Sequence, residues 1–179
     1  MEPELSALDS RPSTLDSQGV VAALCTSDQK GTPKEPVWCA VFEREFGILG
    51  DAHAGPGPRQ LSILDVKDHE YMRSKLPDIH FGAFGENLVF EGIDLSQFGV
   101  GSRFLLGEKV EISITQIGKT CHARCAIFEK TGDCIMPRAG LFARVLGNGP
   151  VWVGDTVRVL EHLTRGASGP ETSLKEPLR

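Results

Sequence analysis

The chain has 179 residues, of which 40% are hydrophobic and 24% charged, an ordinary composition for one globular domain with a sizeable core. Its net charge of −5 and the lack of a basic run argue against a nucleic-acid partner, and no apolar stretch approaches the roughly 20 residues of a membrane span. Five cysteines are too few for a disulfide scaffold, and the acidic N-terminus lacks the apolar core of a secretory signal, so we expect a reduced, cytoplasmic protein.

The two ends of the chain differ in composition from its middle. Residues 1–17 and 163–179 are polar and contain serine and proline, so we expect both ends to be poorly ordered. No linker, repeat or low-complexity tract interrupts residues 18–162, and this region is expected to form one domain.

In chain order, the middle of the sequence consists mostly of short runs typical of β-strands. These runs are apolar or alternate between apolar and polar residues, and turn residues bound them. The expected strands are 20–26, 37–42, 60–64, 87–90, 103–106, 110–116, 141–146 and 156–160. Two further segments, 66–76 and 121–130, are expected to be helical. Many short strands with few helices predict a mainly β fold with a barrel or barrel-like sheet.

Residues 118–144 hold three of the five cysteines and are rich in cationic side chains, among them Lys119. Thiols set among cations tend to be thiolates, which are nucleophiles and ligands for soft metals. Thr120 is a suitable N-cap, which would place Cys121 at the first helical position and Cys125 one turn later on the same face. Either sulfur could then reach the same metal or oxyanion.

Three other interpretations of these cysteines stay open at this point. Cys121, Cys125 and Phe128 also form the i, i+4, i+7 stripe of a buried helix face. Cys134 and His122 could complete a zinc site with them, although the C-x3-C spacing fits zinc motifs loosely. A thiol redox protein with a Cys121–Cys125 or Cys125–Cys134 bond is the last interpretation.

A glycine-rich loop over residues 47–60 precedes the strand at 60–64. It supplies polar side chains beside a backbone that a ligand can approach closely, namely those of Asp51, His53, Arg59 and Gln60. The plainer interpretation is a wide turn in which Asp51 and Arg59 pair.

A second glycine turn carries Glu86 and Asn87, and its plainer interpretation is a β-turn in which Asn87 bonds its own backbone. Arg144 lies among apolar residues and needs an anionic ligand or an acidic partner, for which Glu86 and Asp51 are candidates. Among the remaining residues, Trp38 and Trp152 are expected to pack in the barrel and His69 to be solvated.

Taken together, GILGDAHAG, RQLSILD, FGAFGENLVFEGIDL, the late cysteines and GLFARVL…VWVGDTVRVL resemble a MOSC domain, the module named for the C-terminal region of molybdenum-cofactor sulfurases. The resemblance covers roughly residues 20–160, and the order and spacing of the motifs make it specific. It implies a MOSC-type β-barrel with a few short helices. It also implies binding of molybdenum cofactor, in its molybdopterin form, or of a related molybdenum species, with one cysteine as sulfur carrier or metal ligand.

The resemblance assigns roles to particular residues. In small bacterial relatives the functional cysteine follows the strand and turn directly and maps to Cys121, whereas relatives with a cysteine after an arginine point to Arg124–Cys125. Both cysteines are therefore candidate catalytic residues and metal ligands. The implied cofactor-binding residues are Asp51, His53, Arg59, Gln60, Glu86, Asn87, Lys119 and Arg144.

Larger family members carry a pyridoxal-phosphate desulfurase domain or an iron–sulfur domain, and we expect neither cofactor in this chain. Activity as a sulfurtransferase-like enzyme or a molybdenum-dependent reductase would then need partners in trans: a cysteine desulfurase, a cofactor-biosynthesis protein or a molybdoenzyme. A cofactor carrier without turnover, a zinc-binding interaction module and a thiol redox protein are the alternatives.

Overall fold

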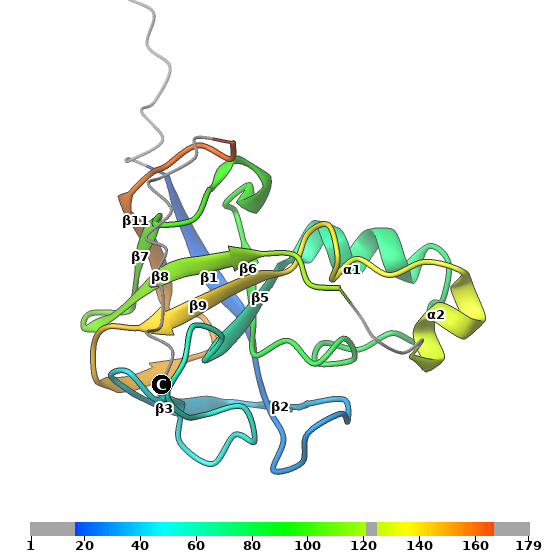
Figure 1. Ribbon diagram of the computed structural model, residues 1–179, viewed down its shortest axis with the longest axis horizontal. Coiled ribbons are helices and arrows are strands. Elements are labelled where there is room, and N and C mark those ends of the chain that lie inside the picture. The colour runs from blue at the N-terminus through cyan, green and yellow to red at the C-terminus, as the bar shows by residue number, and fades with distance from the viewer. Residues whose placement is uncertain (1–16, 121–124, 167–179) are drawn as a thin grey trace, which may run out of the picture.

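The computed structural model describes residues 17–120 and 125–166, and most of this part of the chain forms a β-barrel (Figure 1). The barrel strands, in chain order, are β1 (Gln18–Thr26), β5 (Leu61–Asp65), β6 (Leu88–Glu91), β7 (Arg103–Leu106), β8 (Val110–Ile117), β9 (Leu141–Val145) and β11 (Thr156–Glu161). They pair in the order β11-β7-β8-β9-β5-β6-β1, and β1 pairs with β11 to close the barrel. All neighbours are antiparallel except β5 and β6, which are parallel.

A second, smaller sheet lies against the barrel. It has the order β10-β3-β4, formed by β10 (Gly149–Trp152), β3 (Cys39–Glu43) and β4 (Gly47–Ile48). Its inner side chains, which include Phe42, Ile48 and Val151, belong to the same buried cluster as the barrel interior. The short strand β2 (Glu35–Val37) pairs with the end of β1 and leads directly into β3.

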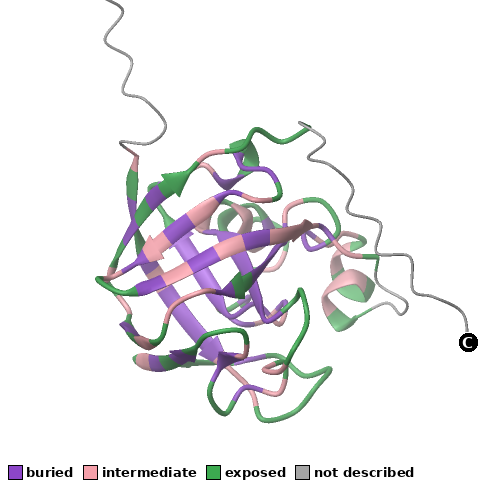
Figure 2. Cartoon of the chain, turned by 60° about the vertical axis from the view of Figure 1, so that its left-hand side comes forward, coloured by how far each residue is buried: buried purple, intermediate pink, exposed green. Residues whose placement is uncertain are grey.

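Buried and partly exposed residues alternate along strands such as β7 and β8, and the colour bands of Figure 2 show such alternation in the barrel, whereas all five residues of β5 are buried. In β8, Val110, Ile112 and Ile114 are buried, and the residues between them are partly exposed. This is the period-2 pattern that a strand with one face on a core requires.

Two α-helices lie together at one end of the barrel (Figure 1). Helix α1 (Val66–Arg73) connects the parallel strands β5 and β6, and it begins with a capping box between Asp65 and Asp68. Helix α2 (Ala126–Thr131) ends at Gly132, whose φ of 70° lies in the left-handed region that glycine adopts most easily. A short 3-10 helix, η2 (Leu95–Gln97), follows β6. Among the described residues, no helix is long and apolar enough to cross a membrane.

The mainly β barrel that the sequence predicts is confirmed, and each of the eight expected runs contains a strand. Strands β4 and β10 were not expected, because the glycines and Pro150 in these segments indicate turns. Proline is tolerated in β10 because this strand is at the edge of its sheet. Of the two ends that are expected to be poorly ordered, 1–17 and 163–179, residues 1–16 and 167–179 lie outside the described residues. Residues 17 and 163–166 are described, and Thr164 forms an isolated β-bridge with Phe98.

Three expectations about single elements or side chains are wrong. Helix α2 begins at Ala126 with Cys125 as its N-cap, so Cys125 does not lie one turn inside the expected helix 121–130. Trp38 and Trp152 are exposed on the surface because they belong to the outer sheet and its border. His69 is fully buried because it lies on the inner side of α1, where its Nε2 is hydrogen-bonded to Glu86.

Candidate functional site

The site centres on a buried ion pair between the segment that precedes β2 and the loop that follows β4. The side chains of Lys34 and Asp51 are each only 1% exposed, and Lys34 Nζ donates to Asp51 Oδ2 at 2.5 Å. Two backbone amides also donate to this carboxylate, those of Ser27 at 3.1 Å and His53 at 2.9 Å. A buried charge is tolerated only when it is paired and hydrogen-bonded, and Asp51 meets both conditions.

The pKa of Asp51 lies below its ordinary value. Burial alone would raise this pKa, but the hydrogen bond from Lys34 and the two backbone N–H donors outweigh the effect of burial. Asp51 is therefore a carboxylate, and its charge is compensated within the protein.

His53 lies beside this pair with its Nδ1 3.2 Å from Lys34 Nζ. Its pKa is lowered by burial and then by the positive charges of Lys34, Lys119 and Lys30, against the opposing effect of Asp51. The imidazole is therefore neutral near neutral pH. Because an ammonium only donates, Nδ1 must accept from Lys34, and the ring proton is assigned to Nε2.

The backbone of the glycine-rich loop lets Asp51 point inward. Gly47 and Gly50 adopt φ angles of 119° and 83°, which favour glycine, and the amide of Ala52 donates to the carbonyl of Ser27 at the end of β1. The loop is thereby tied to the same strand end that supplies the Ser27 amide to Asp51.

Glu86 forms a second buried polar centre behind Lys34. Its carboxylate accepts from His69 Nε2 at 2.7 Å and from the amides of Gly82 and Phe84 at 2.6 and 3.0 Å. The Gly82 carbonyl in turn accepts from the amide of Lys34 at 2.9 Å. Glu86 thus fixes the backbone that positions Lys34, and its oxygens are occupied by the protein.

Asn87 also bonds within the protein rather than pointing into open space. Its Oδ1 accepts from the amide and hydroxyl of Ser62, and its Nδ2 donates to the carbonyl of Cys25 at 3.1 Å. Gln60 is 1% exposed and its Oε1 accepts from the Val145 amide, while its Nε2 has no hydrogen-bond partner among the described residues. These side chains link β1, β5, β6 and β9.

The two arginines of the expected pocket lie apart from the Lys34–Asp51 pair. The Arg59 guanidinium is 5.8 Å from the ring centroid of Phe142. Among the described residues the ion-pair partners of Asp51 are Lys34 and His53, so the plainer interpretation, a turn in which Asp51 pairs with Arg59, is wrong. Arg144 pairs with Glu45 at 2.7 Å and both side chains are 45% exposed, so its partner is neither Glu86 nor Asp51.

Of the candidate cysteines, Cys121 lies outside the described residues, as does His122. Cys125 is exposed and makes no capping hydrogen bond with its side chain. Cys134 is half-buried against the small apolar cluster between α1 and α2. Cys25 is fully buried, and burial followed by the charge of Glu86 raises its pKa to about 12, so this thiol is unreactive. Among residues 17–120 and 125–166, no group of three or more His, Cys, Asp and Glu side chains could hold a metal ion.

The structure therefore brings Asp51 and His53 together with Lys34. The charge of Lys119, which precedes Cys121 by two positions, also contributes to the lowered pKa of His53. Sequence reasoning missed Lys34, although it contacts both Asp51 and His53. A lysine between a proline and a glutamate is typical of a solvated loop. Lys34 is buried by contacts with Asp51 and His53, which are 17 and 19 positions away in the sequence.

The closed barrel and the loop with the GDAHAG motif are consistent with the protein family to which the sequence is similar. The model of the MOSC domain matches residues 50–158, and the chain belongs to this family.

Individual relatives show how far the similarity extends. A protein named reductase, from Gibberella moniliformis, is 29% identical to this chain over 143 residues. The match covers 70% of this chain but 24% of the relative, so the chain spans about a quarter of that protein. The YuaD protein of Bacillus subtilis has a TM-score of 0.69 at 18% identity, over 82% of this chain and 97% of YuaD. YiiM of Escherichia coli has a TM-score of 0.60 at 20% identity, over 82% of this chain and 71% of YiiM. The last two likenesses show the fold.

Proposed function

We propose that this chain binds molybdenum cofactor, or a related molybdenum–sulfur species, through the thiolate of Cys121 or Cys125. The bound species would serve cofactor sulfuration, carriage or a small molybdenum-dependent reaction. The observation that carries the proposal is the buried Lys34–Asp51 pair with neutral His53 beside it. The positive charge of Lys119 contributes to the lowered pKa of His53.

The chemistry of these residues fits an anionic ligand. Lys34 already compensates the charge of Asp51, so the charges of Lys119 and Lys30 leave this region positive toward a phosphate or oxo group. The Nε2–H of His53 is a neutral donor, because Nδ1 accepts from Lys34. When bound, the group supplies a redox-active metal and a sulfur that can be transferred. Lys119 and His53 would hold its anionic part, and a thiolate two or six residues beyond Lys119 would be a soft ligand for its metal.

The remaining expected residues support the site from behind. Glu86, through Gly82, positions the backbone of Lys34, and Asn87 ties the end of β1 to β5. We propose that they hold the candidate site in shape without contacting the ligand. Arg59 and Arg144 would act at its outer rim.

Partners in trans are part of the proposal. The fungal relative named reductase is about four times as long as the segment that it shares with this chain, so most of that protein lies outside the matched segment. For the present chain, we propose that a cysteine desulfurase, a cofactor-biosynthesis protein or a molybdoenzyme supplies or receives the sulfur or the cofactor.

The test is the molybdenum and pterin content of the protein purified from cells that make the cofactor. Wild type is expected to contain both, and Cys121→Ala or Cys125→Ala to lose most of both. Cys39→Ala is the matched control, because Cys39 is half-buried on β3 in the second sheet. A folded wild-type protein without molybdenum or pterin would refute the proposal, as would wild-type content in both cysteine variants.

The same samples test the alternatives. About one equivalent of zinc, with unfolding on chelation, would replace the proposal by a zinc-binding module. Loss of two accessible thiols after mild peroxide treatment, without bound molybdenum, would replace it by a thiol redox protein.

A further inference from the structure

The outer face of the second sheet is apolar where solvent-facing polar residues are expected. Along β3 and β10, the inward side chains of Phe42 and Val151 are buried in the core. The outward side chains of Val41 and Trp152 are 47% and 42% exposed. An antiparallel sheet that covers a core on one face normally carries polar residues on the other.

The apolar side chains of this face are neighbours. Val41 and Pro150 are directly opposite each other in the pairing of β3 with β10, and Trp152 is two residues further along the same strand. Leu49 is 48% exposed, and its amide donates to the Val41 carbonyl at 2.9 Å. Trp38 is 71% exposed at the border of the sheet, where its carbonyl accepts from the amide of Val153. We call the set Trp38, Val41, Leu49, Pro150 and Trp152 the aromatic face.

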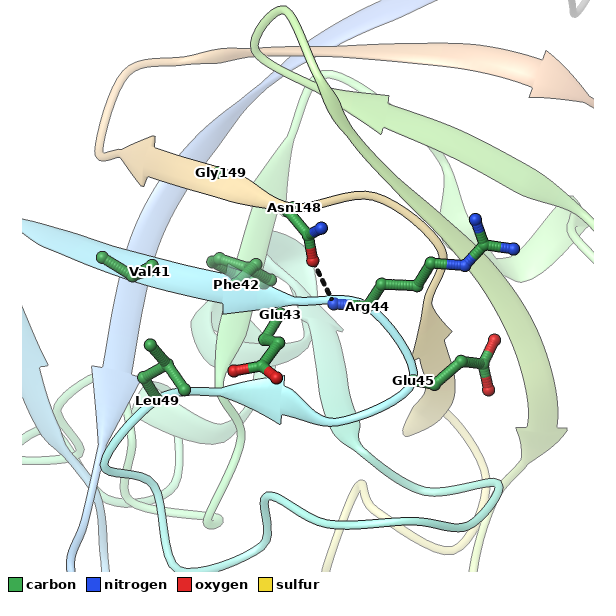
Figure 3. Close-up of a pocket in the computed structure, with 8 residues that line it drawn as sticks. All are labelled: Val41, Phe42, Glu43, Arg44, Glu45, Leu49, Asn148 and Gly149. Atoms are coloured by element: carbon green, nitrogen blue, oxygen red, sulfur yellow. Dashed lines mark hydrogen bonds between the residues drawn. The ribbon is translucent and has the colours of Figure 1, made fainter.

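A pocket of about 630 Å³ continues the aromatic face toward the turn after β3 (Figure 3). Its lining includes Val41 and Leu49 and three charged residues, Glu43, Arg44 and Glu45. Among the described residues neither Glu43 nor Arg44 forms an ion pair, whereas the adjacent Glu45 is paired with Arg144 at 2.7 Å. In Figure 3 the Arg44 guanidinium extends away from the Glu43 carboxylate.

We propose that the aromatic face is an isologous dimer interface, covered by a second copy of this chain. A two-fold axis places the same surface on both partners, so adjacent unpaired charges of opposite sign complement themselves: Glu43 of each copy meets Arg44 of the other. A partner with a different surface would not require both signs on this chain.

The area of the aromatic face supports a dimer. A tryptophan buries about 150–250 Å² when it is covered, so the exposed fractions of Trp38, Trp152, Val41 and Leu49 supply on the order of half of the roughly 800 Å² that each partner buries in a standard interface. Pro150 has no N–H for pairing along the edge of β10, which favours contact between faces over continuation of the sheet.

The interface would also adjoin the candidate site along the chain. Leu49 precedes Asp51 by two positions, and Trp38 follows Lys34 by four. A second copy seated on the aromatic face would therefore hold both segments that carry the buried ion pair.

Sedimentation and intrinsic fluorescence test the dimer together. The chain has two tryptophans, and both belong to the aromatic face, so its tryptophan emission reports directly on this surface. We expect the sedimentation coefficient to rise with concentration from that of a monomer to that of a dimer, and the emission to shift to shorter wavelength over the same range. A protein that stays monomeric up to ~100 μM, or that dimerises without any change in emission, would overturn the proposal.

Variants then locate the interface. Val41→Arg should raise the dimer dissociation constant at least about tenfold, whereas Val100→Arg, at a 53% exposed position in a distant turn, should leave it within about twofold. Glu43→Arg and Arg44→Glu should each weaken the dimer, and the two changes in one chain should restore it because the charges exchange places across the two-fold axis. A double variant as weak as the single variants would overturn the isologous arrangement.

Discussion

The burial of Lys34 makes a strong prediction about stability. Lys34→Met keeps a long side chain but removes the ammonium that lies 2.5 Å from Asp51, whose side chain is 1% exposed. The backbone amides of Ser27 and His53 remain as donors, but the carboxylate becomes an uncompensated buried charge. Breaking a buried pair in this way costs about 3–5 kcal/mol, and for a chain of this size the melting temperature should fall by about 10 °C.

Urea denaturation followed by far-ultraviolet circular dichroism measures this loss, and its pH dependence identifies the cause. In wild type the pKa of Asp51 is lowered, so its contribution to stability is present above its ordinary value of 3.8 and is lost as pH falls through the lower folded value. In Lys34→Met the same pKa should rise above the ordinary value, because burial is no longer opposed by a cation. The difference in stability between variant and wild type should therefore narrow as the pH is lowered toward 3.8 and below.

Replacing both partners is the control. Lys34→Met with Asp51→Leu removes both charges, and it should recover at least about 2 kcal/mol of the loss caused by Lys34→Met alone. A loss below about 1 kcal/mol in Lys34→Met would mean that the pair behaves like a solvated surface pair, and the reasoning would be wrong. The same conclusion would follow from a loss that does not depend on pH.

Gly82→Ala should lower the free energy of unfolding in urea by at least about 2 kcal/mol more than Gly85→Ala. Both glycines have positive φ, but only at Gly82 would an added Cβ overlap the backbone of Lys34. Equal losses of stability in the two variants would contradict this reasoning. Asp133→Asn should speed hydrogen exchange in α2 while changing global stability by less than about 1 kcal/mol, because this partly exposed carboxylate accepts from three side chains that join α1 to the segment after α2. Unchanged exchange would argue against that clamp. The pKa of His53 is lowered from its ordinary value of 6.5, so the free energy of unfolding should fall as the pH decreases from 6.5 toward the pKa of the folded protein. His53→Gln should remove this pH dependence of stability. A pH dependence that persists in the variant must come from another group.

The barrel could be predicted from the sequence because its signal is local. Alternation such as Val110, Ile112 and Ile114 in β8 reports one buried face, and the turn residues between strands mark where each one ends. The closing pair β1–β11 and the parallel pair β5–β6 could not be predicted, because strand order depends on contacts far apart in the sequence.

The candidate site was only partly predictable for the same reason. Asp51 and His53 were named as candidates because they lie in a glycine-rich loop with clear polar character. Lys34 was missed because nothing near it in the sequence indicates burial, and Glu86 was assigned to the ligand although its oxygens accept from His69 and two backbone amides. A single sequence shows which residues are polar, but not which of them the fold satisfies internally.

Strand β1 is shared by three partners along its length: β11 at its start, β6 in its middle and β2 at its end. The contact with β11 joins Gln18 to Arg158, so the barrel closes only after nearly the whole described chain has been brought together. Contacts this distant are slow to form, and closure is therefore expected to be a late step in folding. Until β1 is in place, Ser27 cannot offer its amide to Asp51, so a nascent chain would acquire the candidate site only when the barrel shuts.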